Sequence, residues 1–321
     1  MILSGLAISL AFTAVISLTA AHLTQFKIIG KTVPFAYPWR LSEPTFWTHL
    51  TAWTGYILHN LSVWAILFFA RREKPGFSSE LRWFNWSLIG VNVGFAILHI
   101  LQTRYWYDGL AADVPEITAL GSVALMLMVI LIFETPRRGL ILGKKFAFRE
   151  GFVKIIKQYH GYLFSWAIIY TFWYHPTEGT LGHLVGYFYM FMLFVQSALV
   201  FNRAHVNRLW TFTLEFFVLF HGLVVALLQG GALWPMFVFG FGAMLVLTQM
   251  YGLGLGTWTK RWIAVIFIVS AVAAYSLMGR LPKIHEIARI PVLDYAVVFV
   301  LYLIYLGAVA IGNLLQRRIK N

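Results

Sequence analysis

Histidine is the residue type whose number and spacing in this sequence could support chemistry. Its imidazole titrates near neutral pH and is the commonest metal ligand in proteins, and the chain contains ten. Six fall near the ends of apolar segments that the arrangement below places on one side of a membrane: His22, His49, His99, His175, His183 and His221. A seventh, His59, lies somewhat deeper in its segment. Polar side chains inside a bilayer are costly, so a set at similar depth indicates a functional site.

The stretch HPTEGTLGH, residues 175–183, is the densest part of this set. Pro176 and Gly179 predict a tight turn, which would bring His175, Glu178 and His183 close together. Imidazoles with a carboxylate are ligands that suit zinc, iron or copper. We therefore predict a metal site, with Glu178 as a proton-transfer group and with ligands among the histidines at positions 175, 183, 221, 22, 49 and 59. The spacing matches no established metal motif, and histidines that cap helix ends at the interface are an open alternative.

Tyr187 follows His183 by four residues and so shares its helical face. It is a second candidate for proton transfer. Glu215 lies near the middle of its apolar segment, where a carboxylate is either protonated, paired, or part of a proton or ion path. Asn92 stands seven residues before His99, which predicts a polar column on one helix face. Interhelical hydrogen bonds alone would also explain such a column.

His99 and His221 permit a different cofactor. Their expected depths differ by only ~5 Å at 1.5 Å per residue, and two interior histidines at one level are the axial ligands of haem b in membrane bundles. Gly94 and Gly222 would leave space for the macrocycle. A hydrogen-bonded core histidine on each helix is the alternative.

The elements that must position these residues are membrane-spanning helices. The chain is 60% hydrophobic and 12% charged, and apolar blocks of ~20 residues, each long enough to cross a bilayer, recur along it. The sequence predicts an all-α integral membrane protein with about ten spans in one bundle over residues 1–321. The expected spans are 3–24, 46–69, 84–105, 116–134, 158–175, 183–201, 209–229, 233–252, 262–279 and 292–314.

The basic residues predict the orientation. Of the 25 Lys and Arg, 18 follow the even-numbered spans and 7 lie on the other side. The positive-inside rule then places both termini in the cytoplasm and the six histidines at the outer surface. Residues 144–159 alternate apolar and cationic side chains, which predicts a cytoplasmic amphipathic helix on the membrane surface or a docking surface for a partner.

Composition narrows the function further. The chain has no cysteine, which excludes disulfides, thiolate ligands and cysteine nucleophiles. Its net charge of +13 is explained by the loops and does not indicate nucleic acid. We predict a metal- or haem-dependent membrane enzyme, of redox type, acting in a bacterial inner membrane on a lipid, a quinone or another membrane-soluble substrate. The alternatives are a proton-coupled transporter that uses the buried histidines and an accessory subunit of a larger membrane complex.

Overall fold

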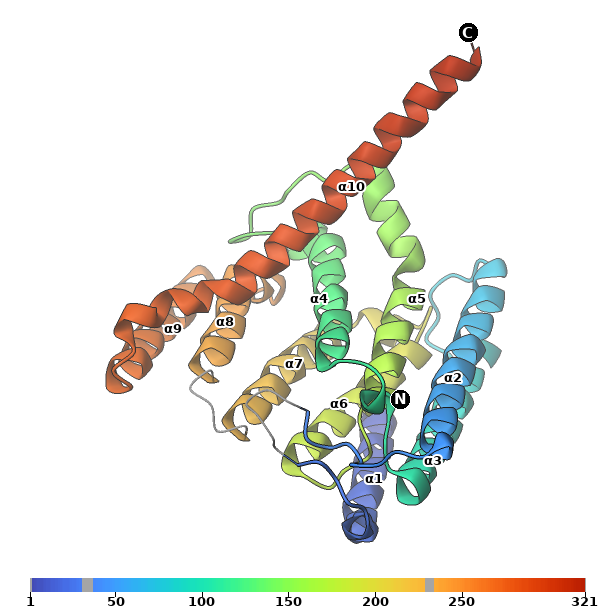
Figure 1. Ribbon diagram of the computed structural model, residues 1–321. Helices are drawn as coiled ribbons and strands as arrows, with labels where there is room; N and C mark the ends of the chain where they lie inside the picture. Colours follow the sequence, from blue (N-terminus) through green and yellow to red (C-terminus); the bar gives the residue numbers. More distant parts are fainter. Residues whose placement is uncertain (1, 31–36, 229–233, 321) are drawn as a thin grey trace. The chain divides into compact units, whose positions relative to one another are not determined.

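The computed structural model describes residues 2–30, 37–228 and 234–320, and in this part of the chain the all-α prediction is confirmed (Figure 1). Ten α-helices are joined by loops and short 3-10 turns, and no strand occurs within these residues. The helices are α1 (Ile2–Thr19), α2 (Phe46–Arg72), α3 (Trp83–Trp106), α4 (Glu116–Arg138), α5 (Glu150–Tyr174), α6 (Leu181–Ala198), α7 (Arg208–Leu228), α8 (Trp234–Leu247), α9 (Thr257–Leu277) and α10 (Arg289–Lys320).

Nine segments among the described residues are long and apolar enough to cross a membrane, so the chain is a multi-pass membrane protein. They contain every α-helix except α5. In α5 the lysines Lys154 and Lys157, together with His160 and several Tyr and Trp, dilute the aliphatic residues. Crossing of the membrane by 158–175 therefore stays a prediction.

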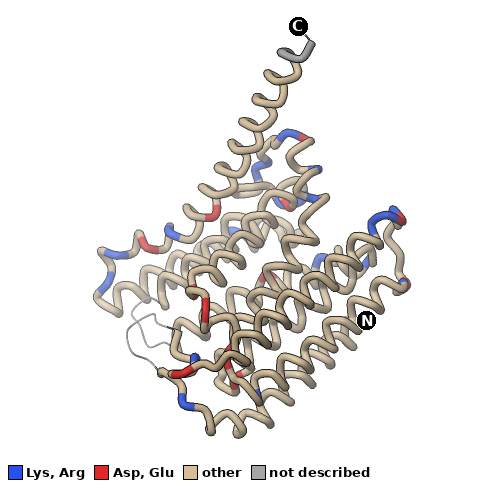
Figure 2. Tube along the Cα trace, turned by 45° about the vertical axis from the view of Figure 1, so that its right-hand side comes forward, with Lys and Arg blue, Asp and Glu red and all other residues tan. Residues whose placement is uncertain are grey.

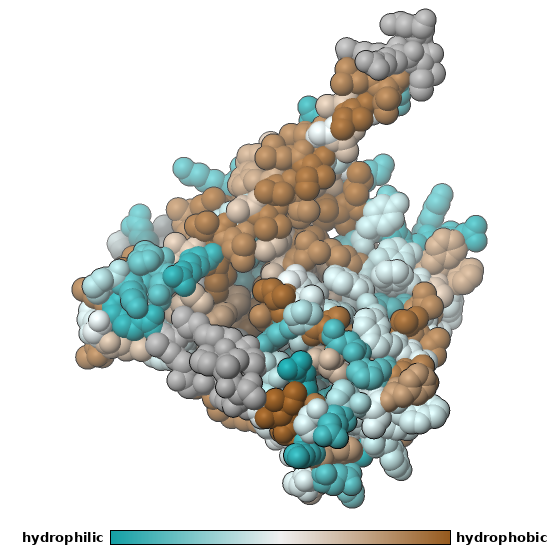
Figure 3. Space-filling view, viewed as in Figure 1, coloured by the Kyte–Doolittle hydropathy of each residue, from teal (hydrophilic) through white to brown (hydrophobic). Residues whose placement is uncertain are grey.

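The surface of the helices is that of a lipid-facing protein. Large apolar side chains such as Leu3, Leu209 and Leu277 are 74–89% exposed, and apolar residues run along α10 (Figure 3). Charged residues gather mainly at helix ends and in loops, as Figure 2 shows. A soluble domain would bury such residues, whereas in a bilayer they contact the lipid chains.

By its internal contacts the chain divides into two compact units. The single membrane domain over residues 1–321 stays a prediction. Unit 1 comprises residues up to 123 and 161–225. Within it α2 packs along α3, α1 packs along α6, and α3 packs against α6. Asn85, Asn92 and His99 stand seven residues apart on α3 and all bond α6 or the turn before it. Unit 1 holds nearly all of the candidate site residues.

Unit 2 comprises residues 124–160 and 226–321. Here α8 packs against α9, α10 and the 3-10 turn η5 (Leu281–Ala288). A core cluster of this unit contains the buried side chains of Ile132, Phe152, Met244 and Val298. Its side chains come from α4, α5, α8 and α10, which explains why these segments form one unit.

The helix expected over 144–159 begins later in the structure. Residues 145–149 are not helical and α5 starts at Glu150. Phe146 and Phe148 instead pack their rings against Tyr302 of α10, at 6.1 and 5.1 Å between centroids. These ring contacts with α10 hold a non-helical path before α5, so the cationic residues 154 and 157 belong to the first turns of a long helix.

Candidate functional site

Tyr37 joins the two histidines of the 175–183 turn. Its hydroxyl lies 2.8 Å from Nδ1 of His175 and 3.2 Å from Nε2 of His183. The other ring nitrogen of His183 is 2.7 Å from the hydroxyl of Thr180, which also accepts the His183 backbone N–H and so caps α6. The turn therefore brings His175 and His183 together, with ring centroids 5.7 Å apart, through a tyrosine that sequence reasoning did not single out.

Tyr187 and His99 form the next layer. Nε2 of His99 lies 3.3 Å from the Tyr187 hydroxyl. Both groups also bond the backbone carbonyl of His175, Tyr187 as a donor at 2.6 Å and His99 at 2.9 Å. The rings of Trp173 and Phe172 flank His99 at 4.4 and 4.8 Å. Nδ1 of His99 is buried, and no described residue bonds it.

His59 forms a third layer, on α2. Its Nε2 bonds the Asn92 side-chain oxygen at 2.9 Å, and its Nδ1 accepts the indole N–H of Trp173 at 3.3 Å. Asn92 in turn donates to the Ser197 hydroxyl at 3.4 Å. Trp173 fits between these helices because Gly55 of α2 has no side chain: a Cβ there would come within 2.6 Å of the indole Cζ2. Trp173 thus contacts both His59 and His99.

Arg104 and Tyr107, at the end of α3, hold the 175–183 turn in place. The Arg104 guanidinium donates to the Thr177 carbonyl at 3.0 Å and to Thr19 at the end of α1 at 2.8 Å. The Tyr107 hydroxyl donates to Glu178 at 2.6 Å. Burial, and then this bond to a carboxylate, raise the pKa of Tyr107. Glu178 therefore accepts a hydrogen bond from a phenol. Sequence reasoning missed Arg104 and Tyr107 because they lie more than 70 residues before the turn that they bind.

His221 and Glu215 lie on α7. The His221 ring packs on the backbone of α6 at Gly186, where a Cβ would come within 2.8 Å of its Cε1. Its Nδ1 is buried and has no hydrogen-bond partner among the residues that the structure describes. Glu215 is 8% exposed and lies near enough to Tyr189 of α6 for its charge to act on that side chain.

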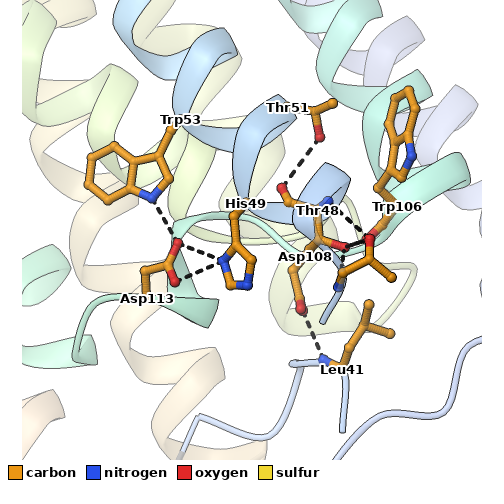
Figure 4. Close-up of polar contacts among 9 residues, drawn as sticks. Leu41, Thr48, His49, Thr51, Trp53, Trp106, Asp108 and Asp113 are labelled. Atoms are coloured by element: carbon orange, nitrogen blue, oxygen red, sulfur yellow. Dashed lines mark hydrogen bonds and ion pairs between the residues drawn. The ribbon is translucent and has the colours of Figure 1, made fainter. Parts of the chain in front are cut away.

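His49 and His22, also predicted as ligands, have different surroundings. His49 forms an ion pair with Asp113 at 2.8 Å, and the Trp53 indole N–H donates to the same carboxylate at 2.7 Å (Figure 4). His22 is exposed in the turn that follows α1. Neither His49 nor His22 takes part in the hydrogen bonds described above for His59, His99, His175 and His183.

Asp108 ties down the segment that carries Tyr37. Its Oδ1 accepts the backbone N–H of Leu41 at 2.9 Å (Figure 4), while the Gln102 side chain donates to its carbonyl at 2.7 Å. Ile29 N–H donates to the Arg40 carbonyl at 2.8 Å and closes the same segment. Burial of the Asp108 carboxyl raises its pKa to about 6, against the lowering effect of the Leu41 hydrogen bond.

The donor set does not fit the predicted cofactors. Within the described residues no three His, Asp or Glu side chains come together as a metal site. Nδ1 of His175 and Nε2 of His183 face Tyr37 instead, and Nδ1 of His183 faces Thr180. A haem between His99 and His221 would need Nε2 of His99, but this atom faces the His175 carbonyl and Tyr187, and two aromatic rings enclose the imidazole.

Comparisons with protein-family models, with curated proteins and with solved structures gave no match. The chemistry of the site therefore rests on its own geometry. Three layers of imidazole and hydroxyl groups lie at successive positions between α2, α3, α5 and α6: Tyr37 with His175 and His183, then Tyr187 with His99, then His59 with Asn92. Each layer contains a group that can accept a proton at one atom and release it from another.

Proposed function

We propose that this chain is a proton-translocating membrane protein and that the three layers of unit 1 are its proton path. The observation that carries the proposal is the Tyr37 hydroxyl between His175 and His183, with the Tyr187–His99 pair below it. An imidazole accepts a proton at one nitrogen and releases it from the other. A hydroxyl between two imidazoles can accept from one while it donates to the other.

The path continues along the contact of α3 with α6. Asn92 bonds Ser197, and Asn85 donates to the carbonyls of Ala198 and Val200 at 2.7 and 2.9 Å. From Asn85 to His99 is fourteen residues, or ~21 Å along the helix, which is most of a ~30 Å hydrocarbon core. Buried atoms without protein partners, such as His99 Nδ1 and Asn60 Oδ1, are the places where bound water would link the layers.

Proton flux into liposomes tests this function. Purified protein is reconstituted with a pH-sensitive dye inside, and a potassium gradient with valinomycin supplies the driving potential. We expect wild-type protein to acidify the lumen faster than empty liposomes do and Tyr37→Phe to abolish most of the difference. Tyr105→Phe is the control, because it removes the same hydroxyl group from a tyrosine of α3 that is 71% exposed. Flux equal to that of empty liposomes, or unchanged flux in Tyr37→Phe, contradicts the proposal.

The redox enzyme predicted from the sequence stays a prediction, as do its quinone or lipid substrate and any partner subunit. Nothing in the donor set favours it over proton translocation. An optical spectrum and elemental analysis of the purified protein decide the matter: a Soret band or stoichiometric zinc, iron or copper would restore the enzyme as the better account.

The proposed path also has a direction. The distribution of Lys and Arg supports cytoplasmic termini and an outer position for Tyr37, with α5 as a tenth span. The cell membrane of a bacterium is the membrane we expect. Protons would then enter at the Tyr37 layer from the outside.

A further inference from the structure

Unit 2 contains a buried ion pair between α9 and α10. Glu286, in the turn η5, is 6% exposed. Its carboxylate accepts from Nη2 of Arg280 at 2.8 Å, and Nη2 of Arg289 lies 3.8 Å away. The two arginines compensate the charge of the buried Glu286 carboxylate. These contacts connect the turn η5 to the residues on either side of it.

The same corner holds donors that the protein does not use. Nη1 of Arg280 and the hydroxyl of Tyr275 are both buried, and within the part of the chain that the structure describes neither has a hydrogen-bond partner. Tyr275, at the end of α9, is fully buried. Arg280 and Glu286 lie near enough for their charges to act on its hydroxyl, and the Arg280 backbone N–H donates to the Tyr275 carbonyl at 2.8 Å. The corner thus contains two buried donors, a guanidinium N–H group of Arg280 and the hydroxyl of Tyr275, for which the described residues provide no acceptor.

The charge of the corner favours an anionic acceptor. Arg280, Lys283 and Arg289 carry three positive charges against one from Glu286. Lys283 is exposed, and Arg289 keeps 57% of its side chain exposed even though it lies near Glu286. A neutral acceptor such as water would satisfy the hydrogen bonds but leave this excess uncompensated.

We propose that residues 275–289 bind a phosphate-type anion, either the headgroup of an anionic phospholipid or a free phosphate. Arginine presents paired N–H groups that match the oxygens of phosphate, and a tyrosine hydroxyl adds a third donor. The corner joins two membrane-spanning helices, where phospholipid phosphates are found. Lys283 and Arg289 attract the anion, and Arg280 with Tyr275 bind its oxygens. This inference concerns unit 2 and does not depend on the proton path.

Native mass spectrometry of the detergent-purified protein tests the site. Phosphatidylglycerol, phosphatidylcholine and inorganic phosphate are added in separate titrations. We expect one molecule of phosphatidylglycerol or phosphate to bind in preference to phosphatidylcholine, and the preferred ligand identifies the source of the anion. Tyr275→Phe removes only the unused hydroxyl and should weaken this binding at least threefold. Arg280→Lys keeps a cation for Glu286 but loses the second N–H group, so it should weaken binding further.

Two variants control for general effects. Tyr295→Phe removes another tyrosine hydroxyl of unit 2, one whose partner is the Leu140 carbonyl at 3.0 Å, and should leave binding unchanged. Lys283→Gln removes an exposed charge and should have a smaller effect than Tyr275→Phe. The proposal is overturned if neither ligand binds better than phosphatidylcholine, or if Tyr275→Phe and Arg280→Lys, both shown to be folded by circular dichroism, bind as wild type does.

Discussion

Replacing Gly55 by alanine should displace Trp173, the side chain that contacts both His59 and His99. The new Cβ would lie 2.5 and 2.6 Å from Cζ3 and Cζ2 of the indole, whereas ordinary contact begins at 3.4 Å. Because Cη2 of the indole would lie closer still, the ring must move by about 1 Å or more. Its N–H already lies 3.3 Å from Nδ1 of His59, so this bond would be lost.

The magnitude follows from comparison with Gly94→Ala on α3, where no atom lies within 4 Å of the new Cβ. Both variants share the helix-propensity gain of about 1 kcal/mol for alanine over glycine, so it cancels. What remains is overpacking, about 1–3 kcal/mol, and one hydrogen bond, about 1 kcal/mol. Gly55→Ala should thus be less stable than Gly94→Ala by about 2–4 kcal/mol.

Reversible unfolding measures this difference. Both variants are transferred into micelles with a rising fraction of sodium dodecyl sulfate, and the helix content is followed by circular dichroism. If Gly55→Ala unfolds at the same detergent fraction as Gly94→Ala, then Trp173 does not fill the space against α2 and the third layer of the site is wrongly described.

Three further outcomes are expected. Gly186→Ala should push the His221 ring off α6, because its Cβ would lie 2.8 Å from Cε1; the variant should unfold at a lower detergent fraction than Gly94→Ala, and equal stability would contradict this packing of His221 on α6. Asp108 should contribute stability that is present at about pH 4 and lost as pH rises to about 6, since burial raises its pKa to about 6 and the folded state then binds the proton more tightly than the unfolded state; in a detergent melting series the wild type should lose stability over this range relative to Asp108→Asn, and an identical pH dependence of the two would contradict it. Thr24→Cys, after α1 on the expected outer side, should react with an impermeant maleimide in intact cells, whereas Ser79→Cys, after α2 on the expected cytoplasmic side, should not. The opposite labelling pattern would contradict the proposed orientation, and the chain has no native cysteine to interfere.

Much of the helix arrangement could be predicted from the sequence. The expected spans 46–69 and 84–105 fall within α2 and α3 as the structure has them, because a stretch of about twenty predominantly apolar residues has few alternatives to a helix in lipid. The first turns of α5 were harder to place. Phe146 and Phe148 pack on Tyr302 of α10, more than 150 residues away, and no local sequence pattern predicts such a contact.

The candidate site was predicted in part. Spacing alone placed His175, Glu178 and His183 at one turn, since Pro176 and Gly179 bend the chain there. The partners of these residues could not be read in the same way. Tyr37 is one of many aromatic residues near helix ends, and nothing in its neighbourhood distinguishes it from residues that only anchor the protein in the interface.

The sequence by itself determined that this is a helical, multi-pass membrane protein with histidines gathered toward one end of its helices, because hydropathy and composition act locally along the chain. Only the tertiary structure decided what those histidines bond. The Tyr37 hydroxyl lies between His175 and His183, and Tyr187 lies beside His99. Trp173 reaches His59 because Gly55 allows close approach, and Arg104 holds the 175–183 turn. Such contacts between distant segments depend on packing and not on any pattern within one segment, and they place the predicted ligands in hydrogen bonds with tyrosine, tryptophan and asparagine side chains.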